Sequence, residues 1–357
     1  MDIIKYTILS LVLLCCHLPL SAKGSYTLSS PNAKLMLNVS AKGREVAYSV
    51  AYNKNALLKD CKAGLDIQGA DMNITIGTVK KRKIKETVKS PFYRCNSFSN
   101  ECNELNIMLG KDWGIIFRAY NEGIAYRFYT LKKGQLIIND ETEDFSFARD
   151  GQSYLAYTTG EKDPFAMAFQ NIYTAKPLSQ QRKQLAFLPV TVDCGAAKVT
   201  IMESDLEAYP GMFVEPDGTS LKGVFAPYPK KMGVYPWRQQ KYVSERESFI
   251  SRTDGDRVYP WRVLAVTDQD TAMPTNNLVY ALASPNRIGD YSWVRPGKVS
   301  WDWWNDWNLK GVPFKAGINM DTYKYYIDFA AKSGLQYIIL DEGWYLSKGG
   351  DMLHSIP

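Results

Sequence analysis

Apolar and polar residues alternate along most of the chain, between residues 25 and 285, and turn residues interrupt the alternation at short intervals. One clear alternating face is formed by Val46, Tyr48, Val50 and Tyr52. A period of two places successive side chains on opposite faces of a strand, and many short strands in a row are typical of antiparallel sandwiches. The pattern predicts a large antiparallel β-sandwich domain over residues 23–290.

One hairpin can be placed within this domain. Residues 113–120 and 124–129 have the pattern of two neighbouring strands, separated by Asn121, Glu122 and Gly123. A three-residue connection that contains glycine is typical of a bulged hairpin. We therefore expect these strands to pair antiparallel through a three-residue turn.

The pattern changes towards the C-terminal end. Residues 299–304 have the pattern of a strand, residues 321–333 have helical spacing followed by Gly334, and residues 337–340 are continuously apolar. The apolar positions of the helix are Tyr323, Tyr326, Ile327 and Ala330. No glycine-rich phosphate-binding turn follows the first strand, which argues against a doubly wound nucleotide-binding sheet. The β-α-β order predicts the opening of a (β/α)8 TIM barrel over residues 291–357.

The first residues predict an exported protein. Lys5 precedes a short apolar run, and Leu20-Ser21-Ala22 offers small residues for cleavage, so residues 1–22 have the pattern of a signal peptide. The apolar run is shorter than the ~20 residues of a membrane helix, and no later segment supplies such a run. We expect a periplasmic or secreted protein without a membrane span.

Composition narrows the function classes. Apolar residues make up 45% of the chain and charged residues 22%, as in ordinary globular proteins. The net charge of +6 includes a basic run at residues 80–85, which we interpret as a solvated strand and not as a nucleic-acid site, because no recognition helix surrounds it. In an oxidising compartment, Cys95 and Cys102 could close a small disulfide loop. The 9 Trp and 23 Tyr suit sugar stacking and a large core equally.

Acidic and aromatic residues gather where the two predicted barrel strands end. In βα barrels the functional side chains lie at the C-terminal ends of the strands. The candidate substrate-binding residues are Asp302, Trp304, Asp341, Glu342 and Trp344. Tryptophans offer sugars a platform and carboxylates bind hydroxyl groups, although the aspartates could also only cap a helix or loop. Asp341 and Glu342 cannot be the two opposed carboxylates of a glycosidase, because neighbouring strand residues point to opposite faces.

A second acidic cluster lies within the predicted sandwich. An extended segment would place Glu203, Asp205 and Glu207 on one face, with no lysine or arginine nearby in the sequence. Converging carboxylates suit a hard cation such as calcium. A solvated acidic edge is the alternative, and the spacing alone favours it.

Four motifs together resemble one known family. They are Arg118-Ala-Tyr-Asn-Glu-Gly-Ile-Ala-Tyr-Arg-Phe, Glu203-Ser-Asp-Leu-Glu-Ala-Tyr-Pro-Gly-Met, Arg295-Pro-Gly-Lys-Val-Ser-Trp-Asp-Trp-Trp and Tyr337-Ile-Ile-Leu-Asp-Glu-Gly-Trp-Tyr. In this order they resemble glycoside hydrolase family 97, the α-glucosidases and α-galactosidases of Bacteroidetes. The resemblance implies an N-terminal super-sandwich, a catalytic barrel, a small C-terminal β domain and an active-site calcium ion. It also implies that Glu203 is the calcium ligand that the sandwich provides.

The resemblance further implies hydrolysis of α-linked oligosaccharides, with α-glucosidase favoured over α-galactosidase. A closed barrel needs roughly 250 residues, so we expect the catalytic carboxylates and the other calcium ligands beyond residue 357 and assign the catalytic role to none of the residues above. The chain as written is then expected to be an inactive fragment. The alternatives are a non-catalytic carbohydrate-binding β-sandwich and a related α-galactosidase family, for which no calcium ligand is expected at Glu203. The oligomeric state stays open.

Overall fold

The computed structural model describes residues 24–159, 163–166, 169–236 and 241–341, and most of them form strands. The strands are β1 (Ser25–Ser29), β2 (Leu35–Lys42), β3 (Glu45–Tyr52), β4 (Asn55–Ile67), β5 (Val79–Lys89), β6 (Ser97–Met108), β7 (Trp113–Tyr120), β8 (Gly123–Ser146), β9 (Gln152–Tyr157), β10 (Thr174–Pro177), β11 (Ala186–Asp193), β12 (Lys198–Ser204), β13 (Met212–Asp217), β14 (Ser220–Phe225), β15 (Pro229–Val234), β16 (Lys241–Arg246), β17 (Ser251–Val258), β18 (Trp261–Thr267), β19 (Val299–Trp301) and β20 (Tyr337–Ile339). The helices are α1 (Leu278–Leu282) and α2 (Met320–Lys332), with 3₁₀ turns η1 (Leu178–Gln180), η2 (Asp270–Thr275) and η3 (Asp302–Asn305).

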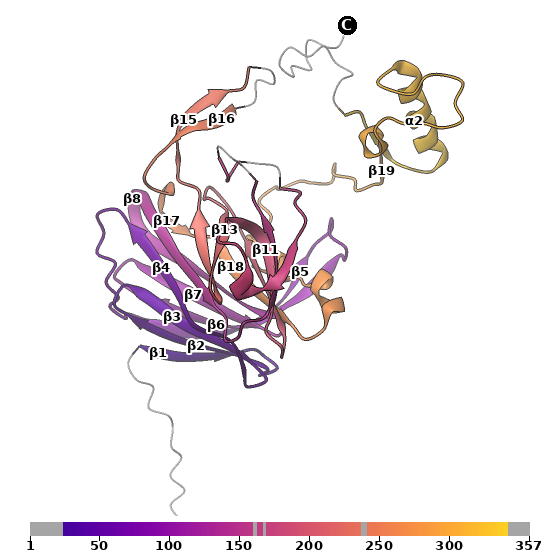
Figure 1. Ribbon diagram of the computed structural model, residues 1–357. Coiled ribbons are helices and arrows are strands. Elements are labelled where there is room, and N and C mark those ends of the chain that lie inside the picture. The colour runs from indigo at the N-terminus through magenta and orange to yellow at the C-terminus, as the bar shows by residue number, and fades with distance from the viewer. Residues whose placement is uncertain (1–23, 160–162, 167–168, 237–240, 342–357) are drawn as a thin grey trace, which may run out of the picture.

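Within the described residues, 16 of the strands form one continuous sheet. Strand β8, which has 24 residues, connects the two parts of this sheet. Its first part pairs with β7 and β18, and its last part pairs with β4 and β14. The sheet folds over on itself around the core (Figure 1). All of its pairings are antiparallel, so the predicted large antiparallel architecture is confirmed, with layers that share β8.

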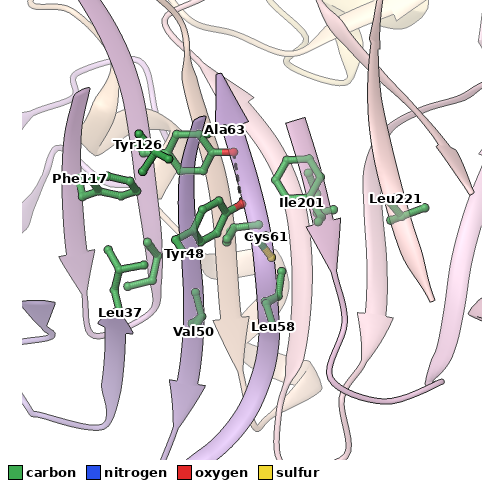
Figure 2. Close-up of a cluster of buried hydrophobic side chains, with 14 of the residues drawn as sticks. Leu37, Tyr48, Val50, Leu58, Cys61, Ala63, Phe117, Tyr126, Ile201 and Leu221 are labelled. Carbon is green, nitrogen blue, oxygen red and sulfur yellow. Dashed lines mark hydrogen bonds between the residues drawn. The ribbon is translucent and has the colours of Figure 1, made fainter. Parts of the chain in front are cut away.

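The alternation of the sequence becomes the core of this sheet. All four residues of the predicted face, at positions 46, 48, 50 and 52, are buried in β3. Figure 2 shows side chains from several strands meeting there, with the Tyr48 hydroxyl 3.3 Å from the hydroxyl of Tyr126. Burial removes this apolar surface from water and stabilises the fold by roughly 25 cal/mol per Å².

The hairpin between β7 and β8 forms, but its turn is shorter than predicted. Tyr120 pairs directly with Gly123, so only Asn121 and Glu122 lie between the strands. Gly123 belongs to β8, where a Cβ atom would lie 2.5 Å from the carbonyl oxygen of Leu264 in β18. The glycine is therefore required by the close approach of a neighbouring strand and not by the turn.

The basic run forms part of β5 and is solvated, as predicted. Arg82 contacts Glu104 at 2.6 Å and Lys85 lies 3.6 Å from Glu101, both across the β5–β6 pair. The proposed disulfide between Cys95 and Cys102 is wrong. Both thiols are free, and Cys102 points into a small apolar cluster beneath α1.

The predicted β-α-β order is confirmed: β19 and β20 pair in parallel, and α2 lies between them in sequence. Asn319 caps α2 by accepting the backbone N–H of Thr322 at 3.0 Å, and Gly334 follows the helix with a φ of 67°. Ile327 was expected on the buried face but is 49% exposed. The first strand ends at Trp301 instead of at residue 304, because the chain turns into η3.

No helix in the described part of the chain is both long and apolar enough to cross a membrane. The expected signal peptide, residues 1–22, lies outside the described residues. Whether the β-α-β unit continues into a barrel stays a prediction.

Candidate functional site

Asp302 ties together the ends of the two parallel strands. It is fully buried at the start of η3, directly after β19. One carboxylate oxygen accepts the indole N–H of Trp307 at 3.1 Å, and the other accepts the backbone N–H of Asp341 at 3.2 Å. Since both oxygens have partners within the unit, Asp302 holds the site together and does not itself present a carboxylate to solvent.

Asp341 lies at the end of β20, beside Asp302 as the parallel pairing requires. Its carboxylate accepts the indole N–H of Trp301 at 2.8 Å. Two aspartates and two tryptophans thus form a hydrogen-bonded seam at the carboxyl ends of both strands. The sequence predicted the aspartates but not their tryptophan donors.

An exposed tryptophan surface adjoins this seam. Trp304 is 80% exposed and Trp303, which the sequence analysis did not single out, is 50% exposed. The ring centroids of both lie 5.8 Å from that of Trp301. Exposed indole faces of this kind can stack on the C–H faces of sugar rings. Glu342 and Trp344, the other two candidates, lie outside the described residues.

Removing the Asp302 carboxylate should loosen the β-α-β unit. Asp302→Ala leaves the Asp341 N–H and the Trp307 indole without their acceptor, a loss of about 1–3 kcal/mol. We expect amide hydrogen exchange in β19 and β20 to become about tenfold faster or more. Asp328→Ala, at an exposed position of α2, is the matched control. Unchanged exchange in Asp302→Ala would show that the seam does not stabilise the unit.

Glu203 lies at the end of β12, not in an open acidic cluster. Its carboxylate contacts Arg262 at 2.7 Å and accepts the backbone N–H of Met212 at 3.1 Å. The side chain is 16% exposed. Burial raises the pKa of Glu203, and Arg262 opposes that rise by favouring the ionised form.

Arg262 is the centre of a buried charge cluster. Besides Glu203, its guanidinium contacts Glu141 at 2.7 Å and lies 3.9 Å from Glu143. Burial by itself would lower the pKa of Arg262, but the surrounding carboxylates outweigh it and raise that pKa. Burial and the neighbouring Glu141 raise the pKa of Glu143 well above its ordinary value, and Tyr126 donates a hydrogen bond to it.

The predicted common face of Glu203, Asp205 and Glu207 is wrong. Strand β12 ends at Ser204, and Asp205 adopts a left-handed conformation with a φ of 60°, so the three side chains diverge. Each carboxylate has its own arginine from a distant part of the sequence. Asp205 contacts Arg127 at 3.2 Å, and Glu207 contacts Arg287 at 2.9 Å. Sequence proximity could not show these partners.

The loop after β12 also anchors the segment that leads to the β-α-β unit. Asp205 accepts both the backbone N–H and the hydroxyl of Ser284, each at 2.8 Å. The described residues show no hydrogen bond from the sandwich to β19, α2 or β20, and Figure 1 shows these elements apart from the large sheet. The structure therefore does not bring Glu203 together with Asp302 or Asp341.

The described residues around Glu203 do not make a calcium site by themselves. Calcium takes 6–8 oxygen ligands, whereas no group of three or more acidic, histidine or cysteine side chains in the described residues could hold a metal ion. Glu203 offers one partly exposed carboxylate, and the cationic Arg262 lies beside it. One carboxylate next to a guanidinium is too few ligands to support a chemical step through a calcium ion.

Two stretches of the chain match the sequence models of known families. Residues 28–285 match the family described as Glycosyl-hydrolase 97 N-terminal, and residues 303–357 match Glycoside hydrolase 97. The chain belongs to glycoside hydrolase family 97. The resemblance carried by the four sequence motifs is thereby confirmed.

Two curated proteins are similar in sequence to this chain. A retaining α-galactosidase of Bacteroides thetaiotaomicron is 39% identical over 98% of this chain and 55% of its own length. A probable retaining α-galactosidase of Streptomyces bingchenggensis is 25% identical over 91% of this chain and 47% of its own length. The chain thus spans about half the length of the curated relatives it matches.

Solved structures agree on the fold. A family 97 enzyme from Pseudoalteromonas sp. strain K8, in complex with panose, superposes with a TM-score of 0.73 at 19% identity, over 92% of this chain and 49% of that one. A β-arabinopyranosidase gives a TM-score of 0.72 at 20% identity, over 92% of this chain and 52% of that one. At these identities the likeness concerns the fold alone.

Proposed function

We propose that the protein takes part in hydrolysis of α-glycosidic bonds, with α-galactosides as the first substrates to test. The observation that carries this proposal is the 39% identity, along nearly the whole chain, to a relative named as a retaining α-galactosidase. The sequence motifs alone favoured α-glucosides, which are therefore the second substrate class. The substrate is an α-linked oligosaccharide, and the expected signal peptide favours export to the periplasm or beyond.

The described residues have distinct roles in this proposal. Trp303 and Trp304 offer exposed faces on which a sugar ring can stack. Asp302 and Asp341 hold the strand ends at which those tryptophans lie. Asp341 also remains a candidate for hydroxyl binding at the rim, because it is less buried than Asp302. These groups bind and orient a sugar, and none of them is assigned to bond cleavage.

Calcium dependence is part of the same proposal. A bound calcium ion would supply positive charge beside a substrate hydroxyl. Glu203 would contribute one carboxylate, oriented by Arg262 and by the Met212 N–H, and the other ligands would have to come from outside the described residues.

The test is an assay of the protein that the native gene encodes, on aryl α-galactosides and aryl α-glucosides. We expect hydrolysis that chelation abolishes and added calcium restores. Glu203→Gln should raise the calcium concentration needed for half-maximal rate by about tenfold or more, whereas Glu207→Gln, in a surface ion pair, should not. Hydrolysis that survives chelation would overturn the calcium proposal only, and no hydrolysis of either glycoside would overturn the proposed function.

A further inference from the structure

A cavity of about 490 Å³ opens on the face of the large sheet that is opposite to the larger core cluster. On β7 the side chains of Ile115 and Phe117 belong to the core, so Ile116, which lines the cavity, points the other way. Tyr129 of β8 also lines the cavity. The volume falls within the ~300–1,000 Å³ that is usual for small-molecule sites.

The Tyr129 ring lies across the sheet surface and forms part of the floor of this cavity. Gly114 of β7 is its direct cross-strand partner, and a Cβ atom there would lie 2.4 Å from the Tyr129 hydroxyl oxygen. Only glycine leaves room for the ring at this position. The hydroxyl then reaches β6, where it donates to Asn106 Oδ1 at 3.0 Å. The ring spans three strands and is fixed at both ends, as a rigid aromatic platform must be.

The rim of the cavity carries unpaired hydrogen-bond donors and an unpaired acceptor. Within the described residues, the side chains of Lys80 and Asp256 have no hydrogen bond or ion pair, and the amide nitrogen of Asn106 has no acceptor. Arg257, also at the rim, instead donates to the backbone carbonyl of Glu207 at 2.7 Å. A cation, an anion and an amide donor around an aromatic floor match a ligand whose hydroxyl groups both donate and accept.

We propose that this cavity binds one pyranose unit of an oligosaccharide, with the apolar face of the sugar on Tyr129 and its hydroxyls directed to Lys80, Asp256 and Asn106. Asp256 would repel an anion such as phosphate, and a purely apolar ligand would leave the charged rim desolvated and unpaired. The site lies on the sandwich and uses none of the residues named in the proposed function. It is thus an additional sugar-binding site, independent of the proposed function.

The test is calorimetric titration of the whole protein with maltotriose and with cellotriose, whose β-linkages an α-glycosidase does not cleave. We expect saturable binding of at least one of these probes. Tyr129→Ala should weaken it by about tenfold or more, which corresponds to about 1.4 kcal/mol, whereas Tyr129→Phe keeps the ring and should stay within about threefold of the native affinity. Lys80→Ala and Asp256→Asn, at exposed positions where folding is not at risk, should each weaken binding several-fold.

The matched control is Tyr173→Ala, which removes an exposed tyrosine elsewhere and should leave binding unchanged. Thermal melts of each variant separate lost binding from lost structure. The proposal is overturned if neither probe binds, or if Tyr129→Ala and the two rim variants bind like the native protein. It is also overturned if Tyr129→Ala abolishes hydrolysis of a short aryl glycoside together with binding, because the cavity would then belong to the hydrolytic site.

Discussion

Replacing Arg262 with methionine is expected to lower the free energy of unfolding by about 3–5 kcal/mol, the usual penalty for breaking a buried ion pair from one side. Methionine fills a similar volume but leaves Glu141 and Glu203 without the guanidinium that both contact at 2.7 Å. The side chains of Arg262 and Glu141 are each only 1% exposed, so water cannot replace the partner that Glu141 loses. Urea denaturation followed by far-ultraviolet circular dichroism measures the change.

A surface arginine and a double mutant show whether the buried charges are responsible. Arg287→Met removes an ion pair with Glu207 whose arginine is 73% exposed, and it should cost less than about 1 kcal/mol. Combining Arg262→Met with Glu141→Gln should recover more than about 1 kcal/mol, because one uncompensated carboxylate is then neutral. Equal losses for Arg262→Met and Arg287→Met, with no recovery in the double mutant, would contradict this account.

The strands that form the core of the sandwich could be predicted, because buried apolar residues alternate with polar residues along their sequence. The face that begins at Val46 alternates with polar residues, and every one of its members is buried. Turn geometry was harder, as Gly123 shows. A glycine near a turn looks like a turn residue, but this one serves the approach of β18, and that strand lies far along the chain.

The sequence predicted the two aspartates of the candidate site but not all of their partners. The positions of Asp302 and Asp341 followed from the rule that barrel residues act at strand ends, and the structure brings the two together. The tryptophans that donate to them were missed, because no repeating pattern in the sequence marks which indole N–H will donate to which carboxylate. The face expected for Glu203 failed because a strand end and a left-handed residue at Asp205 interrupt the alternation on which it rested.

One unusual feature of the sequence, an arginine within an apolar strand, could have indicated that Glu203 has a buried cationic partner. Arg262 stands in an otherwise apolar stretch of β18, and a charge buried within such a strand needs a compensating charge nearby. Glu141 and Glu143 stand two residues apart on β8, which places them on one face. The sequence did not show that these strands face each other, since more than a hundred residues separate them.

The residue before Arg262 points to the opposite face of β18 and carries a second large expected effect. Trp261 is fully buried, with the guanidinium of Arg118 4.8 Å and that of Arg127 4.3 Å from its ring centroid. Trp261→Ala removes both cation–π contacts and leaves a cavity beneath α1, so we expect a loss of about 3–5 kcal/mol in the free energy of unfolding.

The same substitution at Trp304 is the control, because that ring is 80% exposed and its removal should change the free energy of unfolding by less than about 0.5 kcal/mol. Urea denaturation of both variants gives the comparison. Arg127 also holds Asp205, and Asp205 holds Ser284, so a displaced Arg127 should also speed amide exchange at the start of the segment that leads to β19. Similar unfolding free energies for the two tryptophan variants would contradict the expected contribution of the buried Trp261 ring.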